Sequence, residues 1–134
     1  MTHDINIHHE DNHESASSYL VGEIKNLLVN SNRDFSIGLS GGNTPKLTYS
    51  MMAEKFDDLS KTFLWTIDDR WIEEDNDLSN QRMINEYFER TDANILKFEF
   101  TSSSPESDAK KYEDKLKSTI QIFDVAILGM GEDG

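Results

Sequence analysis

Apolar residues recur along this chain with two different spacings, and the two spacings alternate. In four segments the apolar residues lie three or four positions apart, the period of an amphipathic helix: residues 13–30, 45–56, 80–90 and 105–120. Between them lie short alternating or mostly apolar segments of strand length: residues 35–40, 62–68, 95–100 and 123–128. Strands that alternate with helices predict a doubly wound, mostly parallel α/β sheet with helices on both faces.

The local pattern also predicts how the first elements begin and which side chains they bury. Five apolar residues define the expected buried face of the first helix: Ala16, Leu20, Ile24, Leu27 and Leu28. The strand over 35–40 alternates apolar and polar positions and runs into a pair of glycines. Thr44 is the expected N-cap of the next helix, and Pro45 suits its first position because a proline lacks the N–H that is not needed there.

Composition and charge narrow the classes of partner. The chain has 134 residues with 36% hydrophobic residues, and it contains 13 basic and 26 acidic residues for a net charge of −13. A strongly acidic surface disfavours nucleic acid and anionic lipid, so we expect neither as a partner. No window approaches the ~18–20 apolar residues of a membrane span, the first residues lack a signal-peptide pattern, and there is no cysteine. We therefore expect a cytoplasmic location and one α/β domain over residues 1–134.

The turn Ser40–Pro45 is the first candidate for a ligand site. Gly41 and Gly42 allow the backbone to approach a ligand closely, and the helix start behind them offers unpaired N–H groups. Ser40, Asn43 and Thr44 add side-chain donors. The arrangement suits a phosphate, but it matches neither nucleotide-binding glycine pattern. A plain tight turn with a capping threonine explains the same residues equally well.

Asp68-Asp69-Arg70 is the second candidate, because it follows a predicted parallel strand, where open α/β sheets bind ligands. Arg70 suits a phosphate or carboxylate, and Asp68 suits a water, a sugar hydroxyl or a proton. A simple Asp–Arg pair at a solvated strand end is the alternative. The loop 75–80 lacks the glycine and terminal glutamate of a calcium loop, so a cap for the next helix is the better interpretation. The four N-terminal histidines are irregularly spaced, which favours a solvated terminus over a metal site.

Three motifs in this order resemble the 6-phosphogluconolactonase family. That family shows Ser-Gly-Gly-Ser-Thr-Pro, then Asp-Glu-Arg with a downstream Asp-x-x-Ser-Asn, then Gly-Met-Gly-x-Asp-Gly-His. The counterparts here are Ser40–Pro45, Asp68–Arg70 with Asp77–Asn80, and Gly129–Gly134. Asn43 stands where the family usually has serine, and Asp69 stands where it has glutamate. The histidine of the last motif would follow Gly134, so the resemblance implies that these 134 residues are the N-terminal part of such an enzyme.

The resemblance implies hydrolysis of 6-phospho-D-glucono-1,5-lactone to 6-phosphogluconate in the pentose phosphate pathway, on a sugar phosphate and with no metal or cofactor. Asp68 and Arg70 would be the catalytic residues. The substrate and its phosphate would contact a set drawn from all three motifs: Ser40, Gly41, Gly42, Asn43, Thr44, Arg70, Gly131 and Gly134. The general base would be the histidine after Gly134, so residues 1–134 alone are expected to be inactive. A glucosamine-6-phosphate deaminase/isomerase and a non-catalytic sugar-phosphate-binding module are the alternatives.

Overall fold

The computed structural model describes residues 3–132 of the chain, and within that range it contains the four helices and four strands that the pattern predicts. Their bounds in chain order are α1 (His13–Val29), β1 (Phe35–Leu39), α2 (Lys46–Lys55), β2 (Thr62–Thr66), α3 (Asn80–Phe88), β3 (Asn94–Leu96), α4 (Pro105–Thr119) and β4 (Val125–Ile127). The last two strands have only three residues each, so they are shorter than predicted.

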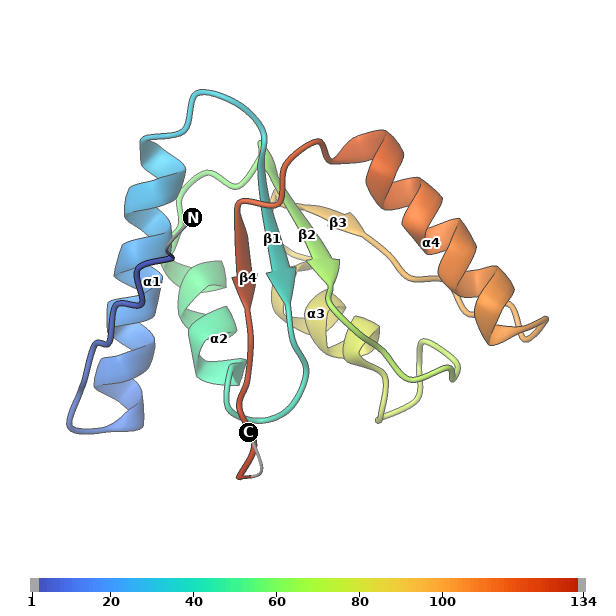
Figure 1. Ribbon diagram of the computed structural model, residues 1–134, viewed down its shortest axis with the longest axis horizontal. Coiled ribbons are helices and arrows are strands. Elements are labelled where there is room, and N and C mark those ends of the chain that lie inside the picture. The colour runs from blue at the N-terminus through green and yellow to red at the C-terminus, as the bar shows by residue number, and fades with distance from the viewer. Residues whose placement is uncertain (1–2, 133–134) are drawn as a thin grey trace.

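The strands form one parallel sheet in the order β3-β2-β1-β4 (Figure 1). From β1 the chain moves outward to β2 and β3, and α4 then returns it to the other side of β1, where β4 pairs. The direction of winding therefore reverses between β1 and β4. This order confirms the predicted doubly wound fold, and it places the switch point, where such folds bind ligands, beside the loop that follows β1.

The helices cover the two faces of the sheet unequally (Figure 1). α1, α2 and α3 pack against one another on one face, and the main core lies between them and the sheet. α4 lies on the other face, where its Tyr112 hydroxyl accepts a hydrogen bond from the Thr66 backbone N–H at 2.9 Å. Among the described residues, no helix is long and apolar enough to cross a membrane.

The predicted strand is confirmed, and β1 is buried along its whole length, at its polar as well as its apolar positions. Its apolar residues point into the main core, whereas Ser36 and Gly38 lie on the α4 face. A Cβ at Gly38 would lie 2.6 Å from the Trp65 ring on the neighbouring strand. The small residues of β1 therefore make room for side chains of β2, so polarity in this strand does not indicate exposure.

Two further expectations are wrong in detail. Leu27 is 54% exposed and Ala16 is exposed, because the buried face of α1 is centred on Ser17, Val21 and Ile24. The other predicted residues of this face are confirmed, because Ile24 is buried and Leu20 and Leu28 pack against the core.

β4 is joined to β1 by a polar network as well as by sheet pairing. The Asp124 carboxylate accepts hydrogen bonds from the Arg33 guanidinium and, at 2.9 Å, from the Ser36 N–H. Ser36 Oγ in turn donates to the carbonyl of Ile122 at 2.5 Å. Burial opposes ionisation of Asp124, but these donors outweigh it and lower the pKa of the carboxyl group. The network fixes where the chain enters β4.

Candidate functional site

The loop between β1 and α2 is held in an open shape by one glycine and one buried tyrosine. Gly42 has a φ of +88°, a conformation that side chains disfavour. Tyr49, fully buried in α2, donates a hydrogen bond from its hydroxyl to the carbonyl oxygen of Ser40 at 2.7 Å. Burial raises the pKa of Tyr49 to about 12, so the hydroxyl remains a donor at neutral pH. Ser40 Oγ is buried and has no hydrogen-bond partner in the described structure.

The start of α2 has no side-chain cap. Pro45 occupies the N-cap position and makes no capping bond, which corrects the role expected for Thr44, whose side chain is exposed. The first turn of α2 contains no acidic residue and begins with Lys46. The positive end of the α2 dipole therefore faces the loop, and no acidic side chain in the first turn of the helix balances it.

The segment after β2 is organised by Asp69. Its carboxylate accepts hydrogen bonds from the backbone N–H groups of Asn80 at 2.7 Å and Gln81 at 3.0 Å, and from the N–H of Arg70 at 2.8 Å. Ser79 Oγ accepts another from the N–H of Arg82 at 3.1 Å. Asp69 and Ser79 thus cap α3 together, so the interpretation of this polar loop as a helix cap is confirmed.

Asn80 connects the loop after β1 with the segment after β2. Its side chain lies against the α-carbon of Gly41, where a Cβ would come within 2.1 Å of the Asn80 amide oxygen. The same side chain donates to the carbonyl of Asp68 at 3.0 Å. Gly41 is therefore required for close approach of loop and helix.

Asp108 on α4 ties down the chain that follows Arg70. Its buried carboxylate accepts from Thr101 through both the backbone N–H and the hydroxyl, and from the Trp71 indole N–H at 3.0 Å. These hydrogen bonds, those of Thr101 first, lower the pKa of Asp108. Trp71, next to Arg70, is thereby anchored to the α4 side of the molecule.

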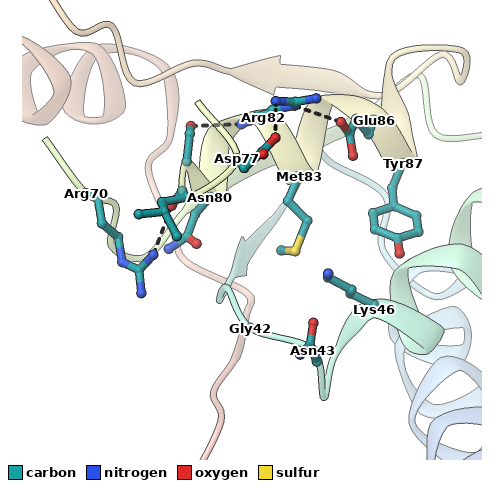
Figure 2. A pocket seen from close by; sticks show the side chains of 12 residues that line it. Gly42, Asn43, Lys46, Arg70, Asp77, Asn80, Arg82, Met83, Glu86 and Tyr87 are labelled. Carbon is teal, nitrogen blue, oxygen red and sulfur yellow. Dashed lines mark hydrogen bonds and ion pairs between the residues drawn. The ribbon is translucent and has the colours of Figure 1, made fainter. Parts of the chain in front are cut away.

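A cavity of about 470 Å³ lies between the β1–α2 loop and α3 (Figure 2). Its lining comprises Gly42, Asn43, Lys46, Arg70, Asp77, Leu78, Ser79, Asn80, Arg82, Met83, Glu86 and Tyr87. Arg82 is neutralised by Asp77 at 2.6 Å and Glu86 at 2.9 Å. The Arg70 guanidinium donates to the carbonyl of Leu78, at 3.0 Å. Within residues 3–132, neither Arg70 nor Lys46 forms an ion pair, so the cavity has two cations available to an anion.

The structure brings together part of the residue set expected from the sequence. Gly42, Asn43 and Arg70 line the cavity. The other expected residues that the structure describes lie outside its lining: Ser40, Gly41, Thr44, Asp68 and Gly131. The sequence reasoning missed Lys46, although its place directly after Pro45 at a predicted helix start was a usable signal. It also missed the capping role of Asp69.

Asp68 and Gly131 nevertheless lie at the carboxyl edge of the sheet. Asp68 is exposed just beyond β2, and Gly131 is exposed beyond β4, which pairs in parallel with β1. Gly134 falls outside the described residues. His8, His9 and His13 are exposed ahead of α1 or at its start. Over residues 3–132 there is no group of three or more His, Cys, Asp or Glu side chains that would hold a metal ion.

Comparison with known proteins identifies a family that matches almost the whole chain. The family model for glucosamine-6-phosphate isomerases and 6-phosphogluconolactonases matches residues 8–134. The chain belongs to this family. Among its members, a 6-phosphogluconolactonase of Synechocystis is 34% identical over 110 residues, which are 74% of this chain and 46% of that protein. One from Thermotoga maritima is 35% identical over 115 residues, 84% of this chain and 52% of that protein.

Solved structures of the family show the same fold. The crystal structure of a 6-phosphogluconolactonase from Shewanella baltica superposes with a TM-score of 0.84 at 28% identity, covering 93% of this chain and 56% of that one. The Thermotoga maritima structure gives 0.79 at 30% identity, covering 91% of this chain and 57% of that one. The chain spans about half the length of the curated relatives it matches.

Proposed function

We propose that the protein containing this chain hydrolyses 6-phospho-D-glucono-1,5-lactone to 6-phosphogluconate, and that residues 40–87 bind the phosphorylated end of the substrate. The observation that carries this proposal is the cavity in which the glycine loop meets Arg70 and Lys46. Both cations lack carboxylate partners among the described residues, in a chain whose net charge of −13 otherwise repels an anion. Local donors and cations around one cavity are what a phosphate requires under those conditions.

The chemistry needs little beyond positioning. Water attacks the lactone carbonyl carbon, the bond from that carbon to the ring oxygen breaks, and the ring oxygen takes a proton. A base near neutral pKa that removes the proton of the water is sufficient for an activated ester. Binding energy from the phosphate, which does not react, holds the carbonyl in place. Asp68, exposed at the end of β2, is available to hold a hydroxyl or the water.

The residues described here supply the binding half of this site. The family pattern places the base in a histidine directly after Gly134, and the histidines at positions 8, 9 and 13 lie at the N-terminal end of the molecule. Arg70 and the names of the relatives favour the lactonase over the deaminase/isomerase branch of the same family. A cytoplasmic location and a sugar phosphate as the sole small-molecule partner belong to the same proposal.

Replacement of Arg70 tests the proposal in the full-length protein. Arg70→Ala is expected to lower kcat/KM for the phospholactone about tenfold or more, because a charge-assisted contact is worth ~1.5–3 kcal/mol. Arg90→Ala is the matched control, since Arg90 is exposed after the C-terminal end of α3. Hydrolysis is followed by the acid released, with the spontaneous rate subtracted. Absence of turnover by the unmodified protein would contradict the lactonase proposal, and equal kinetics for both variants would remove Arg70 from the site.

A further inference from the structure

Lys46 stands in an electrostatically unfavourable place. As the first residue of α2, it puts a positive charge at the positive end of the helix dipole, where acidic residues are normally preferred. Of the other helices, α1 and α4 follow the usual rule, whereas α3 has no acidic residue in its own first turn and is capped by Asp69 and Ser79. Asn12 and Ser104 cap α1 and α4 through their side chains, and the first turns of those helices contain acidic residues.

No ion pair in the described protein offsets this charge. Lys46 has no ion pair within residues 3–132, and no side chain caps α2. Glu86, a carboxylate on the facing wall of the cavity, is held by Arg82 at 2.9 Å. Arg82 is shared between Glu86 and Asp77, and Lys46 remains a cation without an ion pair on the α2 side of the cavity, near Met83 and Tyr87 (Figure 2).

The position of Lys46 suits contact with an anion on the glycine loop. Lys46 is half-buried and lines the same cavity as Gly42 and Asn43 of the loop between β1 and α2 (Figure 2). A lysine ammonium is a compact charge on a flexible stem, so it can follow a phosphate that the more rigid arginine fork does not reach. Arg70, which follows β2, lies on the opposite side of the cavity from Lys46 (Figure 2).

We infer that Lys46 is a specificity-determining residue, which binds the phosphate of the substrate from the α2 side and distinguishes phosphorylated from unphosphorylated lactones. This inference rests on the proposed function. It explains why a lysine stands where its charge is unfavourable to the ligand-free helix: the bound phosphate supplies the negative charge that the first turn of α2 lacks.

Two lysines of one helix allow a matched test. Lys46→Gln and Lys55→Gln change the net charge equally, but Lys55 lies exposed in the last turn of α2, where a positive charge is favourable. In the full-length protein, Lys46→Gln is expected to raise KM for the phospholactone about tenfold with kcat within about twofold, in line with one lost charge-assisted contact. Hydrolysis of unphosphorylated glucono-1,5-lactone is expected to be unchanged. Lys55→Gln should match the unmodified protein on both substrates.

Thermal unfolding with and without inorganic phosphate provides a readout that does not depend on turnover. Phosphate is expected to raise Tm of the unmodified protein and of Lys55→Gln, and to raise Tm of Lys46→Gln much less. Without phosphate, Lys46→Gln should unfold at the same or a higher temperature than the unmodified protein, because an unfavourable charge at the helix start has been removed.

The outcomes separate the two proposals. Equal KM and equal phosphate shifts for the two lysine variants would overturn the role of Lys46, as would an equal loss on both lactones, which indicates a structural effect. Absence of any phosphate shift in the unmodified protein would overturn it as well. If the unmodified protein hydrolyses neither lactone, the lactonase proposal fails, and the phosphate shifts alone still decide whether Lys46 binds an anion.

Discussion

Tyr49→Phe tests how the loop between β1 and α2 is held in place. The substitution keeps the ring and removes one hydroxyl, so it leaves no cavity large enough to disturb the core. The lost interaction is the 2.7 Å hydrogen bond from the Tyr49 hydroxyl to the Ser40 carbonyl, at the end of β1 where the glycine loop begins. The effect of the change therefore acts on the loop through one bond.

The expected magnitude follows from the surroundings of the two groups. A neutral hydrogen bond contributes ~1 kcal/mol net, and a carbonyl left buried without a partner adds ~1–3 kcal/mol. Because Ser40 is only partly buried, water can partly replace the donor. We expect the free energy of unfolding to fall by about 1–2 kcal/mol, measured by urea unfolding. Tyr19→Phe is the control, since Tyr19 is 41% exposed on α1.

Alkaline pH gives the same test a second readout. The pKa of Tyr49 is raised from 10.0 to about 12, mainly by burial. Above pH 10 the unfolded chain therefore releases this proton first, and stability is lost as pH rises towards 12. Phenylalanine has no such proton. The stability difference between the unmodified protein and Tyr49→Phe should thus shrink above pH 10, whereas Tyr112, whose pKa is also raised to about 12, affects both proteins equally.

If Tyr49→Phe has the unfolding free energy of the unmodified protein at neutral pH, and the two pH curves run in parallel between pH 9 and 12, the hydroxyl does not hold the loop. A stability loss with unchanged KM for the phospholactone would show that the loop keeps its shape without the bond.

Two further predictions concern the caps and anchors around the site. Asp69→Asn is expected to lower the urea midpoint and to cost ~1 kcal/mol, because a charged cap on the first N–H groups of α3 becomes neutral; an unchanged midpoint would show that Ser79 suffices. Asp124 has its pKa lowered below the usual 3.8, so its contribution to stability is complete above that pH and is lost as pH falls through the lower value. Asp124→Asn should therefore reduce the loss of unfolding free energy at acidic pH. If both proteins lose stability equally as the pH falls, the hydrogen bonds from Arg33 and Ser36 do not stabilise the ionised Asp124.

The sequence predicted the element order and the doubly wound fold because helix and strand periods alternate cleanly. It misjudged details that depend on neighbours. Leu27 of α1 is exposed because α2 covers a different side of the helix. Ser36 and Gly38 are buried in β1 because Trp65 and Asp124 lie over them, a fact that no local pattern contains.

For the candidate site, the sequence pointed to the loop after β1 and to Arg70, both of which contribute to the cavity, since glycines before a helix start and an arginine after a strand carry their own chemistry. It assigned Thr44 as a cap, but the chain turns one residue later and Pro45 takes that position. The role of Asp69 could not be read from the chain, because its partners at Asn80 and Gln81 are brought to it by the return of α3. Contacts over ten or more positions were the common source of error.

The cavity has one further property: all its lining residues fall between Gly42 and Tyr87, a single uninterrupted stretch that runs from the end of β1 through α3. Loops of that length close quickly relative to contacts that span a whole domain. As the chain leaves the ribosome, the lining of this cavity can assemble from β1, α2, β2 and α3 before α4 and β4 have been synthesised. A ligand that binds in the cavity would then stabilise the nascent half-sheet before the rest of the fold has formed.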